Sequence, residues 1–375
     1  MKQVSYLTID GAWGSTGKGL INGYLANLHN PDTVVCNNGP NAGHTVEFNG
    51  DRVVTCQLPT AAVFPSVEKV MIGPGAIIDI DKLKEEINDY QQFLLGKQIL
   101  IHPNACIVKA FHKKKERNLV DCISSTCKGT GAAQADKIMR DGGAIMGPIE
   151  ERLSDHLDFK DPQIRIVSHT EWLQLIYEAH TLQIESAQGF ELSVDGPFYP
   201  YCTSRPINTW QVMSDCGLPY GMRPEVYVTM RTYPIRVGHS YNSKGKKVGD
   251  SGPVYPDQKE ISFEDLGVEV ERTTVTQKIR RIFTWSWMNF ERMVILLNPD
   301  HMFLNFVNYL EPGPQFGVGF TGGMVKDIEE RYMEICRKWN RPWNSQFVKY
   351  IGTGPDIVDV KQRPYTTRIG SEIDE

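Results

Sequence analysis

The chain has 375 residues, of which 41% are hydrophobic and 23% charged, and its formal net charge is −5. This composition is ordinary for a globular protein, and the acidic balance argues against a protein that coats nucleic acid through a general basic surplus. A small phosphorylated ligand stays possible, because it needs only a local cluster of positive charge.

The sequence shows no sign of a membrane or a secretory pathway. It has no run of eighteen apolar residues, and its first residues do not form a signal peptide. Cys122 and Cys127 lie close together, but no group of His residues accompanies them as zinc ligands. We therefore expect reduced thiols, a cytoplasmic location and no nucleic-acid or membrane partner.

The first hundred residues alternate between strand and helix patterns. Strands are predicted at Gln3–Ile9, Asp32–Cys36, Val67–Ile72 and Gln98–Ile101, and helices at Lys18–Leu28 and Asp81–Leu95. This alternation of strands and helices predicts an α/β fold with a central, mostly parallel sheet flanked by helices. We expect one large domain over residues 1–375. Ligands of such sheets bind at the carboxyl ends of the strands.

Two later segments are rich in turn-forming residues. Gly129–Gly147 is rich in Gly and Ala, and is predicted to be a mobile loop. Ser240–Pro256 is polar and Gly-rich, which indicates an excursion on the surface.

The segment Gly11–Gly19 (GAWGSTGKG) joins the first strand to the first helix. Its glycines allow backbone N–H groups to turn toward an anion, and the helix N-terminus and Lys18 add positive potential. The Walker A pattern is not met, because the preceding glycine, Gly11, stands one residue too early relative to Gly17, and Gly19 replaces Ser or Thr. A glycine-rich turn with no ligand remains the alternative at this point.

A second motif, Asn41–Thr45 (NAGHT), follows the next strand and places His44 in a glycine turn. Together with the first loop it resembles the adenylosuccinate synthetase family. Further segments match that family in the same order: Ser124–Gly131, Glu185–Gly189, Tyr199–Ser204, Arg236–Gly238, Thr273–Arg281 and Gly352–Asp356. The resemblance covers the chain from about residue 3 to about residue 360.

The resemblance implies a fold, a reaction and an assembly. Members of the family transfer the γ-phosphoryl group of a nucleoside triphosphate to O6 of a 6-oxopurine nucleotide, and the amino group of aspartate then displaces that phosphate. They use Mg²⁺, for which Ser15 and Gly43 are the expected protein ligands here. They are homodimers, and Arg140 corresponds to an arginine that reaches the neighbouring subunit's site.

The resemblance also implies the site residues. The catalytic residues are Ser15, Lys18, His44 and Gln188. The substrate nucleotide is bound by Ser15, Asn41, Ser125, Thr126, Arg140, Gln188, Leu192 and Thr203, and aspartate by Thr274, Val275, Thr276, Lys278 and Arg280. The triphosphate is bound by Gly14, Thr16, Gly17, Lys18, Gly19, Gly43, His44, Thr45, Asn305, Asn308, Gly352, Gly354 and Pro355.

Ser15 departs from the family, which has an aspartate at this position. A hydroxyl is a poor general base near neutral pH, but it leaves more room beside C2 of the purine and can accept a hydrogen bond from an amino group there. The sequence therefore resembles the phage-type branch of the family, the 2-aminodeoxyadenylosuccinate synthetases, which act on dGMP. Which group removes the purine N1 proton stays open.

Two further departures concern the other substrates. Asn308 stands where the family reads guanine of GTP with an aspartate, so ATP or dATP is the expected donor, although an asparagine that still reads guanine is the alternative. Lys278 replaces an arginine, which keeps the charge but loses the bidentate fork.

The sequence predicts a ligase that joins aspartate to dGMP through a 6-phosphoryl intermediate. An ordinary adenylosuccinate synthetase that uses IMP and GTP is the first alternative. A catalytically silent nucleotide-binding protein is the second, and the retained catalytic residues argue against it. If a phage encodes the chain, its location is the host cytoplasm.

Overall fold

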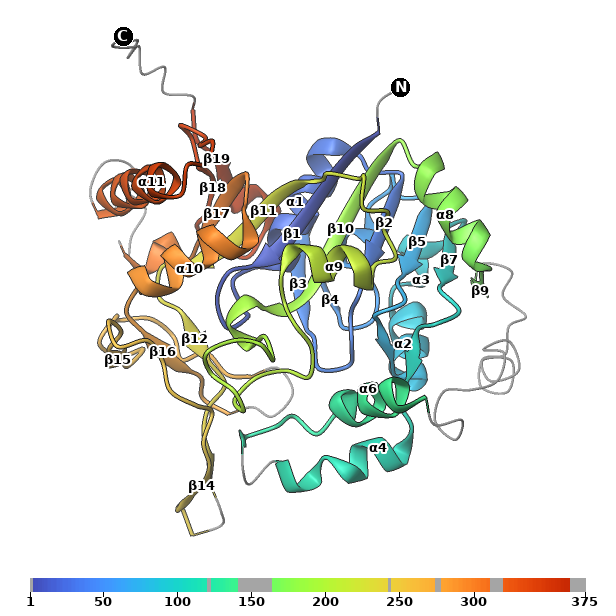
Figure 1. The fold of residues 1–375 in the computed structure, drawn as a ribbon, viewed down its shortest axis with the longest axis horizontal. Coiled ribbons are helices and arrows are strands. Elements are labelled where there is room, and N and C mark those ends of the chain that lie inside the picture. Colours follow the sequence, from blue (N-terminus) through green and yellow to red (C-terminus); the bar gives the residue numbers. More distant parts are fainter. Residues whose placement is uncertain are drawn as a thin grey trace.

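The computed structural model describes residues 3–119, 123–140, 164–241, 244–273, 278–310 and 320–364. A ten-stranded sheet runs through it, in the order β19-β18-β17-β11-β1-β10-β2-β5-β7-β9 (Figure 1). Its strands are β1 (Val4–Asp10), β2 (Thr33–Cys36), β5 (Lys69–Ile72), β7 (Gln98–Ile101), β9 (Ile164–Ile166), β10 (Thr181–Gly189), β11 (Glu225–Arg231), β17 (His301–Asn305), β18 (Val348–Gly352) and β19 (Val360–Gln362). All neighbouring pairs are parallel except β18 and β19.

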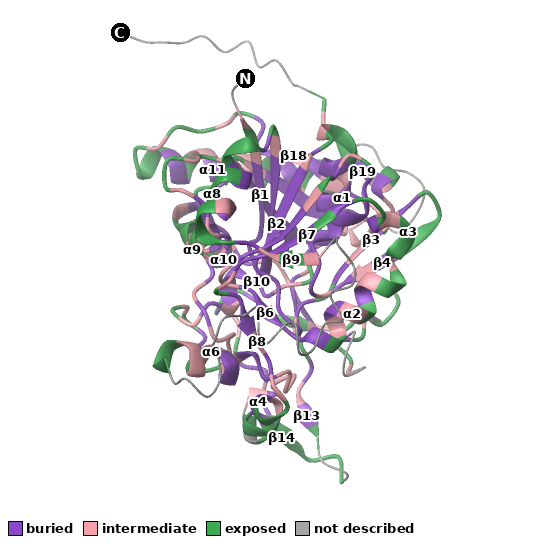
Figure 2. Ribbon diagram, turned by 90° about the vertical axis from the view of Figure 1, so that its right-hand side faces the viewer, coloured by how far each residue is buried: buried purple, intermediate pink, exposed green. Residues whose placement is uncertain are grey.

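The strands are apolar on both faces, as a sheet covered by helices requires. Successive side chains point to opposite faces, so Val34 and Val35 of β2 enter two different hydrophobic clusters, and Val70 and Met71 of β5 do the same. The central strands are buried along their length, whereas the outer surfaces of the helices are exposed (Figure 2).

Each face of the sheet has its own group of helices. The first face is covered by α1 (Lys18–His29), α2 (Ile80–Asp89), α3 (Gln91–Leu94) and the short helix η1 (Thr60–Val63). The second is covered by α8 (His169–Glu178), α9 (Thr209–Asp215), α10 (Trp287–Leu297) and α11 (Phe320–Lys338). Two more helices, α4 (Ala110–Lys115) and α6 (Thr130–Met139), lie below the sheet in Figure 1.

The remaining elements are short. Small sheets are formed by β3 (His44–Phe48) with β4 (Asp51–Thr55), β6 (Ile77–Ile78) with β8 (Cys106–Ile107), β13 (Ser240–Tyr241) with β14 (Lys247–Gly249), and β12 (Ile235–Arg236) with β16 (Arg281–Phe283) and β15 (Glu260–Ile261). The other 3₁₀ turns are η2 (Arg117–Leu119), η3 (Phe190–Leu192), η4 (Val307–Tyr309) and η5 (Ile357–Asp359).

The mostly parallel sheet flanked by helices is confirmed, and the four strands expected in the first hundred residues are present. The helix expected at Asp81–Leu95 is divided at Tyr90 into α2 and α3. That the chain forms one domain over residues 1–375 remains a prediction.

The loop expected at Gly129–Gly147 is wrong for its first part, because Thr130–Met139 forms α6, while residues 141–147 lie outside the described residues. The alanines that suggested a loop pack instead, with Ala133 buried against Ile77 and Cys106. The surface excursion at Ser240–Pro256 is confirmed at its exposed Lys246 and Lys247, although Ser240 and Ser251 at its base are buried.

Within the described residues, none of the helices is long and apolar enough to cross a membrane. The cysteines in the same part of the chain are free thiols, as expected.

Candidate active site

A cavity of about 600 Å³ opens at the carboxyl ends of the central strands, within the range typical of ligand sites. Most of the predicted site residues line it: Gly14, Ser15, Gly17, Lys18, Gly19, Asn41, Gly43, His44, Thr45, Ser125, Thr126, Gln188, Leu192, Thr203, Lys278, Arg280, Asn305, Asn308, Gly354 and Pro355. Residues from all along the chain therefore meet at the edge of the sheet where the fold predicted a site.

Asp10, the last residue of β1, organises the glycine loop from inside the protein. Its Oδ1 accepts hydrogen bonds from the backbone N–H of Ala12 at 2.8 Å and of Gly14 at 3.2 Å. Its Oδ2 accepts from the Thr16 hydroxyl at 2.5 Å and lies 3.5 Å from the Lys18 ammonium. The carboxylate is fully buried, so it holds the loop rather than a ligand.

Two glycines of the loop are required by close contacts. Gly17 has a φ of 93°, and a Cβ there would lie 2.1 Å from the amide nitrogen of Asn305. A Cβ at Gly19 would lie 2.4 Å from the carbonyl oxygen of Thr45. The start of α1 thus packs directly on the NAGHT turn, which explains why glycine replaces the Ser or Thr of a Walker A loop.

Lys18 is buried to 5% exposure but lines the cavity. Its ammonium donates to the carbonyl oxygen of Gln188 at 2.8 Å, and Gln188 itself has a left-handed backbone with a φ of 66°. With Asp10 as its other neighbour, Lys18 has one of its three N–H donors left for a phosphate oxygen.

His44 lines the cavity at the start of β3, and its Nδ1 forms a hydrogen bond with Oε1 of Glu185 in β10. Glu185 is held in turn by Thr60, whose backbone N–H donates to Oε2 at 2.8 Å and whose hydroxyl donates to Oε1 at 3.2 Å. A carboxylate at Nδ1 favours a proton on that nitrogen, which leaves Nε2 for a ligand in the cavity.

Ser15 is exposed in the cavity and has a left-handed backbone, with a φ of 55°. Its carbonyl oxygen accepts a hydrogen bond from Arg231 at 3.2 Å. The hydroxyl is therefore presented from a defined backbone position on the loop.

The segment that carries Ser125 and Thr126 is anchored on both sides. Ser124 accepts two hydrogen bonds from Ser240, one from its N–H and one from its hydroxyl, both at 3.1 Å. The Glu116 carboxylate accepts from the N–H groups of Gly129, Gly131 and Ala132 at 2.7 to 3.1 Å, and so caps the N-terminus of α6.

Two of the expected aspartate-binding residues line the cavity, Lys278 and Arg280. The Lys278 ammonium donates to the Ser240 hydroxyl at 2.6 Å, which connects it to Ser124. Burial lowers the pKa of Arg280, an effect that Glu271 opposes and Arg231 increases. The other three expected residues, Thr274, Val275 and Thr276, lie outside the described residues.

The two asparagines expected at the triphosphate occupy different environments. Asn305 donates from Nδ2 to the Thr16 carbonyl oxygen at 3.3 Å and accepts at Oδ1 from the Phe306 N–H at 2.9 Å, so its amide is occupied by the protein. Asn308 lines the cavity without such contacts in the described residues, and is the asparagine available to a base.

Three predicted residues do not line the cavity: Thr16, Arg140 and Gly352. The buried Thr16 hydroxyl contacts Asp10 and Thr229, each at 2.5 Å, so a bond from Thr16 to the triphosphate would come from its backbone, and this role remains a prediction. Gly352 packs against Asn305. Arg140 is exposed at the end of α6.

The structure also adds residues that the sequence did not single out, namely Asp10, Glu185, Arg231 and Glu271. Asp10 precedes the glycine loop and Glu185 opens a segment that matches the family, so their positions offered a weak signal. Arg231 and Glu271 offered none.

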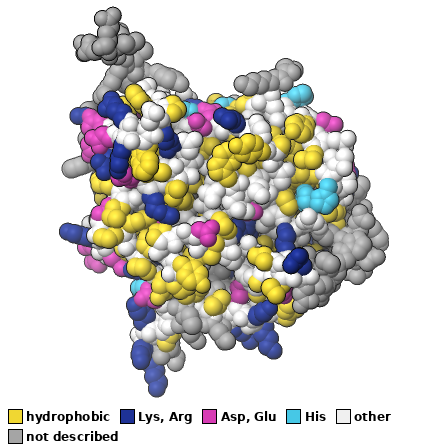
Figure 3. All heavy atoms as spheres, viewed as in Figure 1, with side chains coloured by type: hydrophobic (Ala, Val, Ile, Leu, Met, Phe, Trp, Pro, Cys, Tyr) yellow, Lys and Arg dark blue, Asp and Glu magenta, His cyan; other side chains and the backbone are white. Residues whose placement is uncertain are grey.

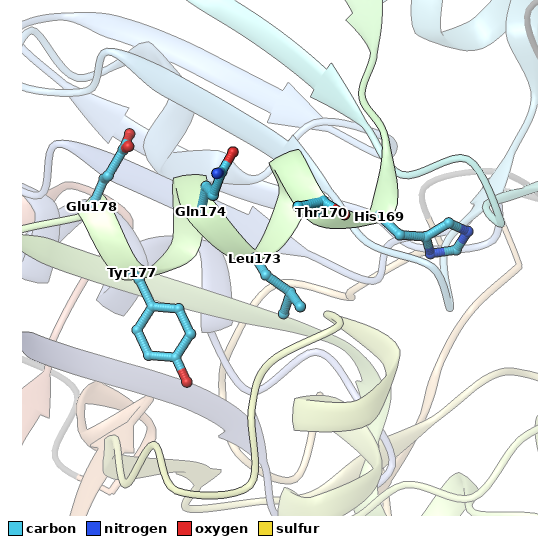
Figure 4. A pocket seen from close by; sticks show the side chains of 6 residues that line it. All are labelled: His169, Thr170, Leu173, Gln174, Tyr177 and Glu178. Carbon is cyan, nitrogen blue, oxygen red and sulfur yellow. The ribbon is translucent and has the colours of Figure 1, made fainter.

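The cations that a phosphorylated ligand requires line the cavity itself, among them Lys18, Lys278 and Arg280. On the face drawn in Figure 3, Lys and Arg side chains lie over β14 and α4 at the bottom and also at the upper left. A second hollow, on the surface of α8, contains no Lys or Arg (Figure 4). It is lined by His169, Thr170, Leu173, Gln174, Tyr177 and Glu178, and Leu173 and Tyr177 point to the opposite side of the helix from Gln174 and Glu178. It does not fit a phosphate.

A glycine loop with a buried lysine and a carboxylate-oriented histidine, at the carboxyl ends of a parallel sheet, defines a nucleotide-dependent enzyme of the α/β class. Comparisons with known proteins name the family. Residues 8–168 match the family model described as adenylosuccinate synthetase. The N6-succino-2-amino-2'-deoxyadenylate synthase of Salmonella phage PMBT28 is 39% identical over 362 residues, which cover 94% of this chain and 96% of that protein. The chain belongs to the adenylosuccinate synthetase family.

Other relatives support membership of the same family. The enzyme of the same name from Acinetobacter phage SH-Ab 15497 is 42% identical, with 80% of this chain and 83% of that protein covered. The solved structure of the cyanophage S-2L succinoaminodeoxyadenylate synthetase, bound to dGMP and dATP, matches with a TM-score of 0.82 and 35% identity over 97% of each chain. Adenylosuccinate synthetase from Plasmodium falciparum, at 18% identity and a TM-score of 0.71 over 97% of this chain and 100% of that one, shares the fold.

Proposed function

We propose that this chain is a ligase that joins L-aspartate to C6 of dGMP, with ATP or dATP as the phosphoryl donor. The products are N6-succino-2-amino-2'-deoxyadenylate, phosphate, and ADP or dADP. Such a product leads to DNA in which diaminopurine replaces adenine, and the enzyme would act in the cytoplasm, that of the host if a phage encodes it. Four phage relatives at 36 to 42% identity carry the name of this activity.

One observation carries the choice of dGMP over IMP: Ser15 is exposed in the cavity, where the family has an aspartate. A serine is smaller than an aspartate, so it leaves space for the 2-amino group of guanine, and its hydroxyl can accept a hydrogen bond from that group.

The chemistry requires two steps. In the first, O6 of the purine bonds to the γ-phosphorus while the bond from that phosphorus to the leaving diphosphate breaks, and N1 loses its proton. In the second, the aspartate nitrogen bonds to C6 and loses a proton while the C6–O6 bond breaks and phosphate leaves. Catalysis therefore depends on stabilising charge on O6 and on the phosphoryl oxygens.

The residues of the cavity suit these demands. Nε2 of His44 can hold a proton or donate a hydrogen bond at O6, because Nδ1 is bound to Glu185. The free N–H of Lys18 and the amides of the glycine loop neutralise phosphoryl oxygens. Lys278 and Arg280 supply two cations for the dicarboxylate of aspartate.

Magnesium fits this site as an ion bound mainly by substrate. The described residues contain no group of three His, Cys, Asp or Glu that could hold a metal. Mg²⁺ prefers oxygen ligands and commonly takes them from water and phosphate, so the Gly43 carbonyl and the Ser15 hydroxyl suffice as protein ligands. When bound, the ion neutralises charge on the triphosphate.

We also propose a homodimer in which Arg140 completes the neighbouring subunit's site. Its exposed position outside its own cavity supports a role in another subunit.

Mass spectrometry of products tests the function. Purified protein receives dGMP, GMP, IMP, ATP, dATP, GTP, Mg²⁺ and aspartate together, and then each purine monophosphate alone. The expected product is the succinylated derivative of dGMP. A succinylated product from IMP alone would overturn the proposal in favour of an ordinary adenylosuccinate synthetase.

A further inference from the structure

One fully buried arginine lies beside the cavity and contacts three of the residues that line it. Arg231 is the last residue of β11 and has no exposed surface. Its Nη1 donates to the Ser15 carbonyl oxygen and to Oε2 of Glu271, both at 3.2 Å, and its Nη2 donates to Oε1 of Glu271 at 2.5 Å. The guanidinium carbon lies 3.7 Å from the centre of the Phe306 ring.

Two of these partners have a backbone that non-glycine residues seldom adopt. The φ angles of Ser15 and Phe306 are 55° and 58°, both left-handed. Such a conformation persists only where the surroundings impose it. Phe306 is also held by Asn305 and Thr232, which bond to its N–H and carbonyl at 2.9 and 2.7 Å. Among the described residues, the carbonyl of Ser15 has Arg231 as its hydrogen-bond donor.

The third partner fixes the arginine itself. Burial alone would raise the pKa of Glu271, but the Arg231 guanidinium and the Tyr309 hydroxyl hold it below its ordinary value. The Tyr309 hydroxyl donates to Oε1 at 2.9 Å. Glu271 is therefore a carboxylate that accepts both prongs of the guanidinium, and this leaves Arg231 a single position.

We propose that Arg231 is a positioning residue that sets purine selectivity by holding the backbone of Ser15 against the 2-position of the bound base. This inference rests on the proposed function. Selectivity for an amino group depends on where the hydroxyl stands, and a small displacement of the loop would remove the hydrogen bond or close the space.

The role requires arginine in particular. A planar guanidinium can bond to Glu271 with two nitrogens, share one of them with Ser15, and stack on Phe306. Lysine at position 231 would keep the positive charge but lose the paired hydrogen bonds to Glu271 and the stacking on Phe306. Arg231→Lys is therefore the informative substitution.

A second arginine–glutamate pair, with a buried Glu191 and a partly exposed Arg292, provides a control. Arg292 donates from Nη1 to both carboxylate oxygens of Glu191, at 3.0 and 2.9 Å, and lies over the Phe190 ring at 4.8 Å. Arg292 does not line the cavity. Arg292→Lys therefore causes a similar loss of geometry away from the purine.

The experiment compares kcat/KM for dGMP and for IMP in the parent enzyme and in both variants. We expect the dGMP-to-IMP ratio to fall about tenfold in Arg231→Lys, as for the loss of one charge-assisted bond, and to stay within twofold in Arg292→Lys. Equal ratios in the two variants would overturn the inference. Should Arg231→Lys not fold, Phe306→Leu removes the stack on Arg231, together with the ring contact to Tyr309, and leaves the hydrogen bonds of Arg231 in place. The same fall in the ratio is expected, and an unchanged ratio overturns the inference.

Hydrogen exchange separates this inference from the proposed function. The amides of Gly14 to Gly17 should exchange faster in Arg231→Lys than in Arg292→Lys, whatever the substrate. If the parent enzyme does not convert dGMP, the proposed function fails, and faster exchange still supports the positioning role. Equal exchange rates overturn it.

Discussion

In the proposed function, the side chain at position 15 decides how much room the purine has at its 2-position. Ser15→Asp adds a carboxylate to an exposed site in the cavity, in a left-handed backbone that aspartate tolerates well. We expect kcat/KM for dGMP to fall by about 100-fold, because the amino group then meets a larger side chain, and activity on IMP to rise. Steady-state rates on both nucleotides measure the change.

Ser15→Ala separates space from hydrogen bonding. It keeps the room for the amino group and removes the acceptor together with one proposed Mg²⁺ ligand. At saturating Mg²⁺, dGMP should remain the preferred substrate, with kcat/KM reduced by about three- to tenfold. If Ser15→Asp leaves the preference unchanged, the argument from volume is wrong.

Glu185 orients His44, and its role can be tested without changing a residue that lines the cavity. Glu185→Gln replaces the carboxylate at Nδ1 with a neutral amide, which offsets less well the positive charge of a ring that carries hydrogen on both nitrogens. Nε2 therefore becomes a poorer hydrogen-bond donor to O6. We expect kcat to fall by about 100-fold with a KM for dGMP within threefold of the parent value. Glu191→Gln, in a buried network outside the cavity, is the control. A rise in KM with constant kcat would contradict the assignment.

At the residue scale, the sequence predicts best the site residues that belong to a short, recognisable loop motif. Lys18, Ser15 and His44 could be found because glycine-rich turns mark the loops that carry them. Glu185 gave only a weak signal and Arg231 none, because each acts through a contact with a residue that is 141 or 216 positions away along the chain. Such contacts depend on the register of parallel strands, which short motifs do not encode.

At the element scale, the segment around Ser240 joins two regions that are proposed to bind substrates. The Ser240 hydroxyl accepts from Lys278 and donates to Ser124, next to Ser125 and Thr126. Removing it in Ser240→Ala should raise the KM for aspartate by about tenfold, the value of one hydrogen bond to a charged group, because Lys278 loses its anchor.

Two further variants show whether the hydroxyl of Ser240 or its packing causes the change in KM. Ser240→Thr keeps the hydroxyl and should restore the KM. Ser186→Ala removes another buried hydroxyl, one with no hydrogen-bond partner in the described structure, and should leave the KM for aspartate unchanged. The same rise in both alanine variants would show that Ser240 acts only through packing.

The predicted and missed elements differ in what stabilises them. The four strands that the sequence predicts are short apolar runs whose burial on both faces requires a sheet, and their predicted ends lie within about two residues of those observed. The helix α6 was missed because glycines open its sequence. It forms because Glu116 caps its N-terminus and Ala133 packs on Ile77, and neither contact is visible in the local pattern.

At the scale of the whole molecule, the sheet has a catalytic end and a structural end. The carboxyl ends of the strands carry the cavity. At the other end, the first residues of β11 and β17 form an ionic cluster with Lys349, the second residue of β18. Glu225 accepts hydrogen bonds from His301 at 2.5 Å and from Lys349 at 3.2 Å. The His301 bond is the main cause, with Lys349, of a pKa for Glu225 of about 2, compared with an ordinary value of 4.5 and against the opposing effect of burial.

This shift predicts how stability responds to acid. A carboxyl group whose pKa is lowered on folding stabilises the native state above its unfolded pKa, and this contribution is lost as the pH falls toward the folded pKa. The free energy of unfolding should therefore differ between the parent protein and Glu225→Gln by a constant amount above about pH 5, and the difference should shrink between about pH 4.5 and pH 2.

Urea unfolding at a series of pH values, followed by tryptophan fluorescence, measures this difference. Glu264→Gln, at an exposed position, corrects for the general effect of removing one negative charge. Because the cluster lies at the end of the sheet away from the cavity, Glu225→Gln should keep the parent kcat and KM at pH 7. A difference in unfolding free energy that stays constant down to pH 3 would show that Glu225 does not stabilise the fold through its charge.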